Sequence, residues 1–286
     1  MGEAAREEIY PLKRDKEESA RLNDQHAFLV DLFGGNQIHP SIPKDRLFDI
    51  ADIATGTGIW LQDVSKLLKD VPADRPRYYH GFDISAEQFP SDPGELHFSI
   101  QDVLKPFPPE HLNRYDLVHV RLLVGALREE EFKEVVANVA TLLKPGGYLQ
   151  WDEIDSSTLI IDPNRDQHPT LTVLGQLMLD FMKKSGCTLC APARVLEGCQ
   201  AAGLSDVTRH DYHTDDRPEL RDRTRAWLRR VFQALLPVGL VRTGREADMQ
   251  TAEKKAEEMI KEVDGDFAAG HVLNVRLGVV VARKPL

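Results

Sequence analysis

The sequence has only three cysteines and no long hydrophobic run. The cysteines are Cys187, Cys190 and Cys199. A structural zinc site needs four ligands and no second paired cluster is present, so we interpret them as reduced cysteines in or near a helix. The most apolar segment, 277-LGVVVA-282, has the length of a strand, whereas a membrane-spanning helix needs about 20 apolar residues. These absences argue against a structural zinc site and a membrane partner.

Positive charge is also in deficit. Lysine and arginine number 36 and aspartate and glutamate 46, which gives a formal net charge of −10. A nucleic-acid partner requires a basic footprint, so we expect none; the basic segment 221–230 has the spacing of a solvated helix face. The N-terminal segment is charged and lacks the apolar core of a signal peptide, so a cytoplasmic location is the default expectation.

Up to about residue 155, segments with the hydrophobic spacing of a strand alternate with segments that have the spacing of a helix. Helical spacing covers 17–33, about 59–69 and 129–144. Strand patterns cover 48–54, 77–85, 95–103, 115–123 and 148–154. Strands that alternate with helices predict an α/β fold with a Rossmann-like, doubly wound and mostly parallel sheet.

The pattern changes after residue 155. Helical patterns at 170–186 and 192–203 are followed by strand patterns at 204–214 and 272–283, and we expect the last strand to be antiparallel. The two strands are separated by a helical insertion at about 215–270. We predict an N-terminal helical lid at 1–43 and a main domain at 44–286, with the insertion and the lid covering the ligand edge of the sheet. Apolar residues of the insertion are interpreted as helix core rather than pocket lining: Trp227, Phe232, Leu235 and Leu236.

A glycine turn interrupts the segment 48-FDIADIATGTGIWLQDVSKLL-68 between its strand and its helix. Ligands of open parallel sheets bind beyond the carboxyl ends of the strands. Gly56 and Gly58 let the backbone approach a small molecule there and present N–H groups at a helix N-terminus. The dinucleotide fingerprint needs a third glycine where this chain has Leu61, which disfavours a nicotinamide cofactor.

The spacing Asp52-x-Ala54-x-Gly56-x-Gly58, with Asp83, Asp102 and 143-LKPGGYLQW-151 following in order, resembles the class I S-adenosylmethionine-dependent methyltransferases. The resemblance covers about 48–155 and the final two strands, and Ala54 stands where glycine is usual. The segments 10–26, 54–64, 80–90 and 117–127 are similar to fungal secondary-metabolite methyltransferases, a group that includes LaeA-like regulators and gliotoxin-type N-methyltransferases.

The resemblance implies a site for S-adenosyl-L-methionine, with S-adenosyl-L-homocysteine as product. Asp83 would accept hydrogen bonds from both ribose hydroxyls, Asp102 would accept one from the adenine amino group, and Asp52 would face the methionine portion. Alternatively, Asp83 caps a helix, Asp102 starts a turn and Asp52 braces the loop. The resemblance also implies that the N-terminal helix folds over the cofactor, so Tyr10, Arg14 and Arg21 are candidates to meet its carboxylate. The alternative is a solvated, salt-bridged helix face, which we prefer for Arg14. The predicted cofactor residues are Tyr10, Arg21, Asp52, Ala54, Thr55, Gly56, Gly58, Asp83, Ile84, Asp102, Val103 and Arg121.

Catalytic candidates lie at the carboxyl ends of the fourth and fifth strands: His119, Arg121, Trp151, Asp152, Glu153 and Asp155. Period-two alternation puts Trp151, Glu153 and Asp155 on one face and Asp152 on the other. Glu153 is the candidate base or would stabilise a developing ammonium, and Trp151 would wall the transfer site. The alternative for the acids is a helix cap and loop solvation. The cation of Arg121 opposes a magnesium site; His168, His210 and His213 rank below Glu153 as bases.

The predicted function is therefore S-adenosylmethionine-dependent methyl transfer to a nitrogen or oxygen of a small natural product, such as an amide nitrogen of a diketopiperazine. Two alternatives stay open: a cofactor-binding regulator of secondary metabolism, and a methyltransferase fold repurposed as a cyclase or isomerase. The expected partner is a small-molecule substrate, and a homodimer is a hypothesis.

Overall fold

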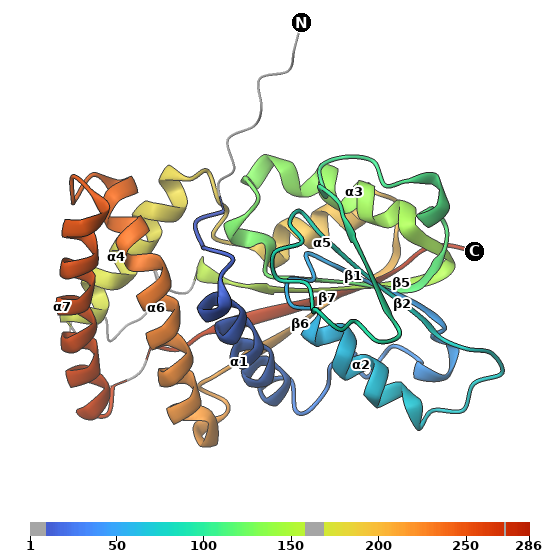
Figure 1. Ribbon diagram of the computed structural model, residues 1–286, viewed down its shortest axis with the longest axis horizontal. Helices are drawn as coiled ribbons and strands as arrows, with labels where there is room; N and C mark the ends of the chain where they lie inside the picture. Colours follow the sequence, from blue (N-terminus) through green and yellow to red (C-terminus); the bar gives the residue numbers. More distant parts are fainter. Residues whose placement is uncertain (1–9, 158–168, 272) are drawn as a thin grey trace, which may run out of the picture.

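A mostly parallel sheet runs through the molecule (Figure 1). The computed structural model describes residues 10–157, 169–271 and 273–286, and within them the sheet has seven strands in the order β3-β2-β1-β4-β5-β7-β6. Strand β7 runs antiparallel to both β5 and β6, which confirms the predicted fold class. The strands are β1 (Asp49–Ile53), β2 (Tyr78–Asp83), β3 (Leu96–Ile100), β4 (Tyr115–Arg121), β5 (Leu143–Ile154), β6 (Ser205–His213) and β7 (Arg276–Arg283).

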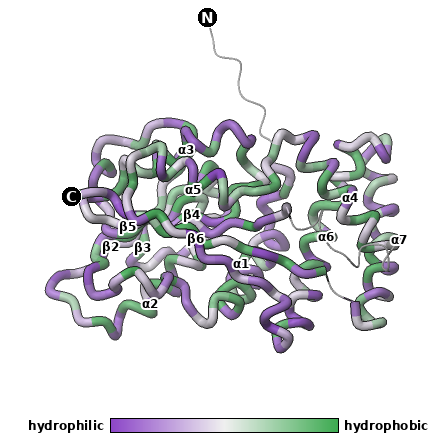
Figure 2. The backbone as a smooth tube through the Cα atoms, turned by 180° about the vertical axis from the view of Figure 1, so that it is seen from behind, coloured by the Kyte–Doolittle hydropathy of each residue, from purple (hydrophilic) through white to green (hydrophobic). Residues whose placement is uncertain are grey.

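Helices cover both faces of this sheet. Helices α1 (Lys16–Leu32) and α2 (Ile59–Lys69) lie on one face, and α3 (Phe132–Leu142) and α5 (Ala191–Ala201) pack together on the other (Figure 1). Side chains of one strand alternate between two hydrophobic cores, so that Leu117 joins the first and Val118 the second. Figure 2 shows hydrophobic residues along the central strands and hydrophilic residues around the outside.

A third group of helices stands beyond the sheet (Figure 1). It consists of α4 (Pro169–Lys184), α6 (Arg221–Thr243) and α7 (Met249–Ala268), which pack against one another. The predicted insertion contains α6 and α7, but α4 precedes β6 and joins the same layer, which the sequence analysis did not foresee. Short 3₁₀ helices occupy Lys44–Arg46, Pro109–His111, Leu123–Gly125, Glu129–Glu131 and Pro218–Leu220.

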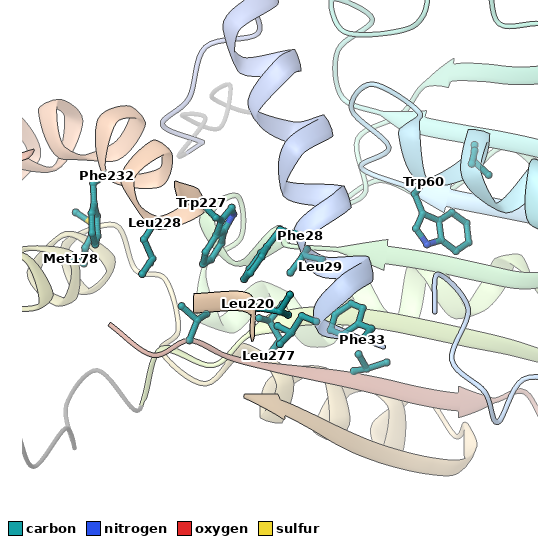
Figure 3. Close-up of a cluster of buried hydrophobic side chains, with 14 of the residues drawn as sticks. Phe28, Leu29, Phe33, Trp60, Met178, Leu220, Trp227, Leu228, Phe232 and Leu277 are labelled. Carbon is teal, nitrogen blue, oxygen red and sulfur yellow. The ribbon is translucent and has the colours of Figure 1, made fainter. Parts of the chain in front are cut away.

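Helix α1 connects the helical layer to the sheet. Phe28 of α1 stacks on Trp227 of α6 with ring centroids 5.1 Å apart, and both side chains belong to the core that also contains Leu277 of β7 (Figure 3). One continuous apolar core therefore joins the N-terminal helix, the layer and the sheet. The division of the chain at residue 43 stays a prediction.

The structure differs from the prediction at the start of β5. The 145-PGG-147 segment belongs to the strand, because Leu143 already pairs with Tyr115 of β4 before the register shifts. A Cβ at Gly147 would lie 2.8 Å from the Tyr115 carbonyl oxygen. Glycine therefore permits a close backbone approach here and does not end the pairing.

In the part of the chain that the structure describes, every helix is too short or too polar to cross a bilayer. The same residues contain no group of three or more His, Cys, Asp or Glu side chains arranged to hold a metal ion.

Candidate active site

A cavity of about 300 Å³ lies at the carboxyl ends of β1, β2 and β4. Helix α1 contributes Arg21, Leu22 and Gln25 to its wall, and α6 contributes Trp227 and Val231. The lining includes every predicted cofactor residue except Gly58. The order of the strands explains this, because β1 lies between β2 and β4 and their ends meet at one edge.

The glycine turn uses left-handed backbone at alternate residues. Ala54, Gly56 and Gly58 have φ values of 54°, 55° and 71°. Gly58 caps the N-terminus of α2, and a Cβ there would lie 2.7 Å from the Phe98 ring. Gly58 does not line the cavity, which differs from its predicted ligand contact: its missing side chain leaves room for the Phe98 ring of β3, whereas Gly56 lines the cavity.

Asp83 at the end of β2 ties the turn to the neighbouring loop. Its Oδ2 accepts a hydrogen bond from the Gly56 N–H at 2.9 Å, and its Oδ1 accepts one from the Ser85 N–H at 3.1 Å. Burial raises the pKa of Asp83, against the opposing effect of these two N–H groups. Each carboxylate oxygen accepts more than one hydrogen bond, so Asp83 can hold the loops and also bind a ligand hydroxyl.

Asp102 starts a turn beyond the end of β3 and also lines the cavity. Its Oδ1 accepts a hydrogen bond from the Leu104 N–H at 3.0 Å. The next residue, Val103, lines the cavity too, and its carbonyl accepts a hydrogen bond from Asn138 of α3 at 3.1 Å. The turn that the sequence analysis considered as the alternative thus coexists with a position in the cavity wall.

A buried hydrogen-bonded chain crosses the sheet at the cavity wall, where Asp52 and His119 line the cavity and Asp152 lies behind them. His119 donates from Nδ1 to Asp52 Oδ1 at 2.7 Å and from Nε2 to Asp152 Oδ2 at 3.0 Å, and Asp52 Oδ2 accepts from the Thr55 hydroxyl. Burial lowers the pKa of His119, but the carboxylates of Asp152 and Asp52 outweigh burial and raise it above its ordinary value. The Trp60 ring stacks on the imidazole with ring centroids 3.9 Å apart, and an aromatic face of this kind favours the protonated form of the imidazole.

Arg121 lies two residues further along β4 and lines the cavity. Its Nη1 donates to His26 Nδ1 at 3.1 Å, and His26 Nε2 donates to Asp63 at 2.9 Å. Burial, together with the charge of Arg121, lowers the pKa of His26 to about 4, so His26 is a neutral acceptor for the guanidinium. Burial also lowers the pKa of Arg121, and the charges of Asp152 and Asp52 oppose that effect.

The N-terminal segment contributes a second group of charges. Arg21 makes two hydrogen bonds of 2.7 Å to Glu18, and the Arg14 guanidinium lies over the Tyr10 ring at 5.5 Å. Burial raises the pKa of Tyr10 to about 12, so its hydroxyl stays protonated. Arg14 lines the cavity, so assigning it to a solvated helix face was wrong.

The side chains of the predicted catalytic group on β5 lie beneath the cavity and do not line it. Trp151, Asp152 and Glu153 are at most 1% exposed. Glu153 Oε1 accepts hydrogen bonds from the Leu123 N–H at 2.7 Å and from Trp151 Nε1 at 3.0 Å. The Asp152 carboxylate accepts a hydrogen bond from His119. This corrects the roles predicted for them, because a base or a wall must touch the substrate.

Burial raises the pKa of Glu153 to about 8. The carboxyl group therefore holds a proton around neutral pH and is bound to the backbone of the 3₁₀ turn Leu123–Gly125, whose residues line the cavity. Leu122, just before that turn, has a left-handed φ of 55°. Glu153 thus acts on the site through the backbone that it holds.

A second cavity of about 160 Å³ adjoins the first. Trp227, Phe232 and Leu236 belong to the hydrophobic core and Leu235 packs against it, as the sequence analysis interpreted them. Trp227 and Leu235 also line both cavities and Phe232 lines the second, whereas Leu236 lines neither. The sequence signal for this lining is weak, because the apolar stripe of a helix does not show which part of it faces a void. The residues shared by the two cavities are Pro11, Val124, Gly125, Ile154, Trp227, Val231 and Leu235.

The lower-ranked histidines lie away from both cavities. His210 stacks on His39 at 4.0 Å and His213 pairs with Asp216 at 3.7 Å. Neither lines a cavity, and His168 is outside the described residues.

Several known proteins that resemble this chain in sequence or in fold are methyltransferases. No family model matches the chain. It is 36% identical over 225 residues to methyltransferase grgD of a Penicillium species, a match that covers 77% of this chain and 78% of that protein. It is 30% identical over 176 residues to N-methyltransferase gliN of Aspergillus fumigatus, with 60% of each chain covered. Phosphoethanolamine N-methyltransferase 2 of Haemonchus contortus, solved with S-adenosyl-L-methionine, has the same fold, with a TM-score of 0.50, 14% identity, and 92% of this chain and 57% of that chain covered.

Proposed function

Because the chain belongs to the S-adenosylmethionine-dependent class I methyltransferases of fungal secondary metabolism, we propose that it methylates a nitrogen of a small natural product. The nitrogen is supported by relatives named N-methyltransferases, among them gliN of Aspergillus fumigatus and verN of Clonostachys rogersoniana. An amide nitrogen of a diketopiperazine is the finer form of the proposal, and an oxygen acceptor is its alternative.

The observation that carries the proposal is the single cavity wall that joins the glycine turn to Asp83 and Asp102. These residues fit the cofactor: Asp83 keeps acceptor capacity for ribose hydroxyls, and Ile84 beside it is 49% exposed, as a surface for a flat apolar ring would be. Asp102 and Val103 would meet the adenine edge. Tyr10, Arg21 and Thr55 would complete the pocket around the methionine portion.

The charged groups of the cavity wall support an orientation in which the methionine portion of the cofactor lies near Arg121 and Asp52. Arg121 has five N–H donors, of which His26 takes one, so it suits a carboxylate at the cavity wall. Asp52 carries its negative charge at the same end and is held by His119 and Thr55. Bound S-adenosylmethionine would supply the methyl group of its sulfonium: the electron pair of the S–CH₃ bond would stay with sulfur, the lone pair of the acceptor would form the new bond, and an N–H acceptor would release its proton to solvent.

The chain then contributes alignment and exclusion of water rather than covalent chemistry. The turn Leu122–Gly125, held by Glu153, and the face of α6 enclose the space in which the acceptor would meet the cofactor. Fixed geometry of this kind replaces the entropy of bringing two reactants together and is worth several kcal/mol in enzymes.

The decisive experiment is turnover with labelled S-adenosylmethionine and a panel of diketopiperazines, amines, phenols and thiols. We expect label in a nitrogen-methylated product. Tight cofactor binding without transfer to any acceptor would instead favour the regulator or the cyclase alternative. A cytoplasmic location and a homodimer belong to the same proposal and are tested by fractionation and by sedimentation of the purified chain.

Asp83→Ala tests the cofactor site directly. We expect calorimetry to show binding of S-adenosylmethionine weakened by about 10- to 100-fold, because two charge-assisted hydrogen bonds are lost. Thermal unfolding of the same variant separates this loss from a loss of folding. Unchanged affinity in a folded variant would remove Asp83 from the site.

A further inference from the structure

The second cavity has walls of a different chemistry from the first. Helix α4 contributes Met178, Phe181 and Met182, and α6 faces it with Leu228 and Phe232. Figure 3 shows Met178 and Phe232 together between the two helices. Thioether and aromatic side chains of this kind pack well against aromatic rings.

The size of the second cavity limits what it can hold. Its volume is about 160 Å³. An apolar cavity of roughly 150 Å³ lined by Leu, Ile and Phe stays dry and binds benzene. The second cavity therefore matches one phenyl-sized group, whereas the adjoining cavity of about 300 Å³ contains the polar residues assigned to the cofactor.

The titratable groups that line this cavity favour an uncharged ligand over a charged one. Burial would raise the pKa of Asp155, but hydrogen bonds from Ser157 and the ion pair with Arg209 at 2.7 Å hold it below its usual range. Burial raises the pKa of the Cys187 thiol to about 11, so it is neutral. Arg276 and Asn274 are exposed residues of the lining. A buried carboxylate or ammonium would find no charge partner among the apolar side chains that α4 and α6 contribute.

The indole N–H of Trp227 is an observation independent of the cavity's size, and it also bears on what the cavity binds. Trp227 lines both cavities and is 7% exposed, and its Nε1 has no hydrogen-bond partner within the described part of the chain. A buried donor without a partner costs about as much as a lost hydrogen bond. The nitrogen itself is fully buried, so an oxygen of a ligand would reach it once the indole turns toward the cavity.

We propose that the second cavity is the acceptor subsite, and that it takes a phenyl-sized apolar group of an uncharged substrate. Binding would turn the Trp227 indole so that its Nε1 donates to a carbonyl or ether oxygen of that substrate. This assignment rests on the proposed methyltransferase function and names its substrate class. The nucleophilic atom then lies at the junction formed by Val124, Ile154 and Trp227, where the two cavities meet.

The test is a fluorine NMR titration of the full chain with three probes. Para-fluoroacetophenone has a phenyl ring and a carbonyl oxygen, para-fluoroethylbenzene lacks the oxygen, and para-fluorobenzoate carries a charge. We expect the ketone to bind saturably and most tightly, and the benzoate not to bind. Trp227→Phe should weaken the ketone by about tenfold and leave the ethylbenzene within about twofold.

A matched pair of helix substitutions locates the binding. A Cβ at Gly175 of α4 or at Gly265 of α7 would meet no atom within 4 Å, but only Gly175 lines the second cavity. Gly175→Leu should abolish binding of both neutral probes, whereas Gly265→Leu should leave it unchanged. Thermal unfolding of the two variants checks that both fold.

Ketone binding that survives Gly175→Leu, or ketone and benzoate binding equally to the wild type, would overturn the assignment. The same preparations are titrated with S-adenosylmethionine by calorimetry. Cofactor binding without probe binding removes this inference and leaves the proposed function. Absent cofactor binding removes the proposed function, whatever the probes do.

Discussion

Ala54 occupies a backbone conformation that suits glycine better. Its φ of 54° lies in the left-handed region, where a residue with a Cβ is disfavoured by roughly 1–2 kcal/mol. The turn that follows includes Gly56 and Gly58 in the same region, so neighbouring geometry holds Ala54 there.

Ala54→Gly should therefore stabilise the fold by up to about 1 kcal/mol, because relief of the backbone penalty exceeds the entropy that glycine adds to the unfolded chain. Urea unfolding of the variant and the wild type measures this. A clear loss of stability would mean that the Ala54 methyl group, which packs against the second core, matters more than its φ.

Glu153 makes the stability of the protein depend on pH. Its carboxyl pKa is raised from 4.5 in the unfolded chain to about 8 in the fold. Between these values the fold binds a proton that the unfolded chain releases, so the contribution of Glu153 is complete below pH 4.5 and is lost as pH rises towards about 8. A glutamine at this position could not ionise, but its side-chain oxygen would still accept from the Leu123 N–H.

We therefore expect Glu153→Gln to gain stability relative to the wild type as pH increases from about 5 to about 8, measured by urea unfolding across that range. Methyl transfer by this variant should stay within a few-fold of the wild type, and Glu153→Ala should lose far more. A general base would instead show a loss of roughly 10²- to 10⁴-fold in Glu153→Gln.

Helix α1 carries both core residues and cavity-lining residues. Phe28 is 2% exposed and stacks on Trp227, while Arg21 and Gln25 of the same helix line the first cavity. The contact between α1 and α6 therefore sets the width of the space between the sheet edge and the helical layer.

Phe28→Ala should destabilise the protein by about 3 kcal/mol, as truncation of a buried aromatic side chain does, and should also weaken cofactor binding. Val173→Ala on α4 is the control, because Val173 is 50% exposed and its change should stay within about 0.5 kcal/mol. Calorimetry and thermal unfolding report the two effects. If the Phe28→Ala variant bound the cofactor with full affinity at a temperature where it is folded, the contact between α1 and α6 would not control the width of the binding cavity.

At the scale of the whole molecule, the lining of the first cavity and the packing of the helical layer involve the same residues. Residues of α1, the glycine turn and α6 all line this cavity, so a cofactor bound there would contact elements that come from distant parts of the chain. A ligand that binds only the folded state stabilises it by about 2.7 kcal/mol at 100 times its Kd.

Saturating S-adenosylhomocysteine should thus raise the unfolding temperature and slow amide exchange in α1 and α6 more than in α3, which lies on the far face of the sheet. Hydrogen exchange followed by mass spectrometry measures this difference. Equal protection of α1 and α3 would indicate that the helical layer does not close on the ligand.

Local sequence determined the strands, the helices and the edge of the sheet where the site lies. Short segments carry these signals: the alternating hydrophobic periods, the glycine turn after β1, the acid that ends β2 and the acid just beyond β3. Their geometry follows from backbone rules. The fold class and the positions of Asp83 and Asp102 at one edge were therefore predictable.

Tertiary structure alone decided which side chains reach the cavity. Period-two alternation correctly separates Trp151 and Glu153 from Asp152, but it cannot tell that the turn after β4 covers Glu153 or that His119 bridges to Asp152. In the same way, the apolar face of α6 shows that Trp227 is buried, but only the position of α4 opposite it leaves a cavity there. Burial at a site depends on what distant segments place over it, and that information is absent from any local pattern.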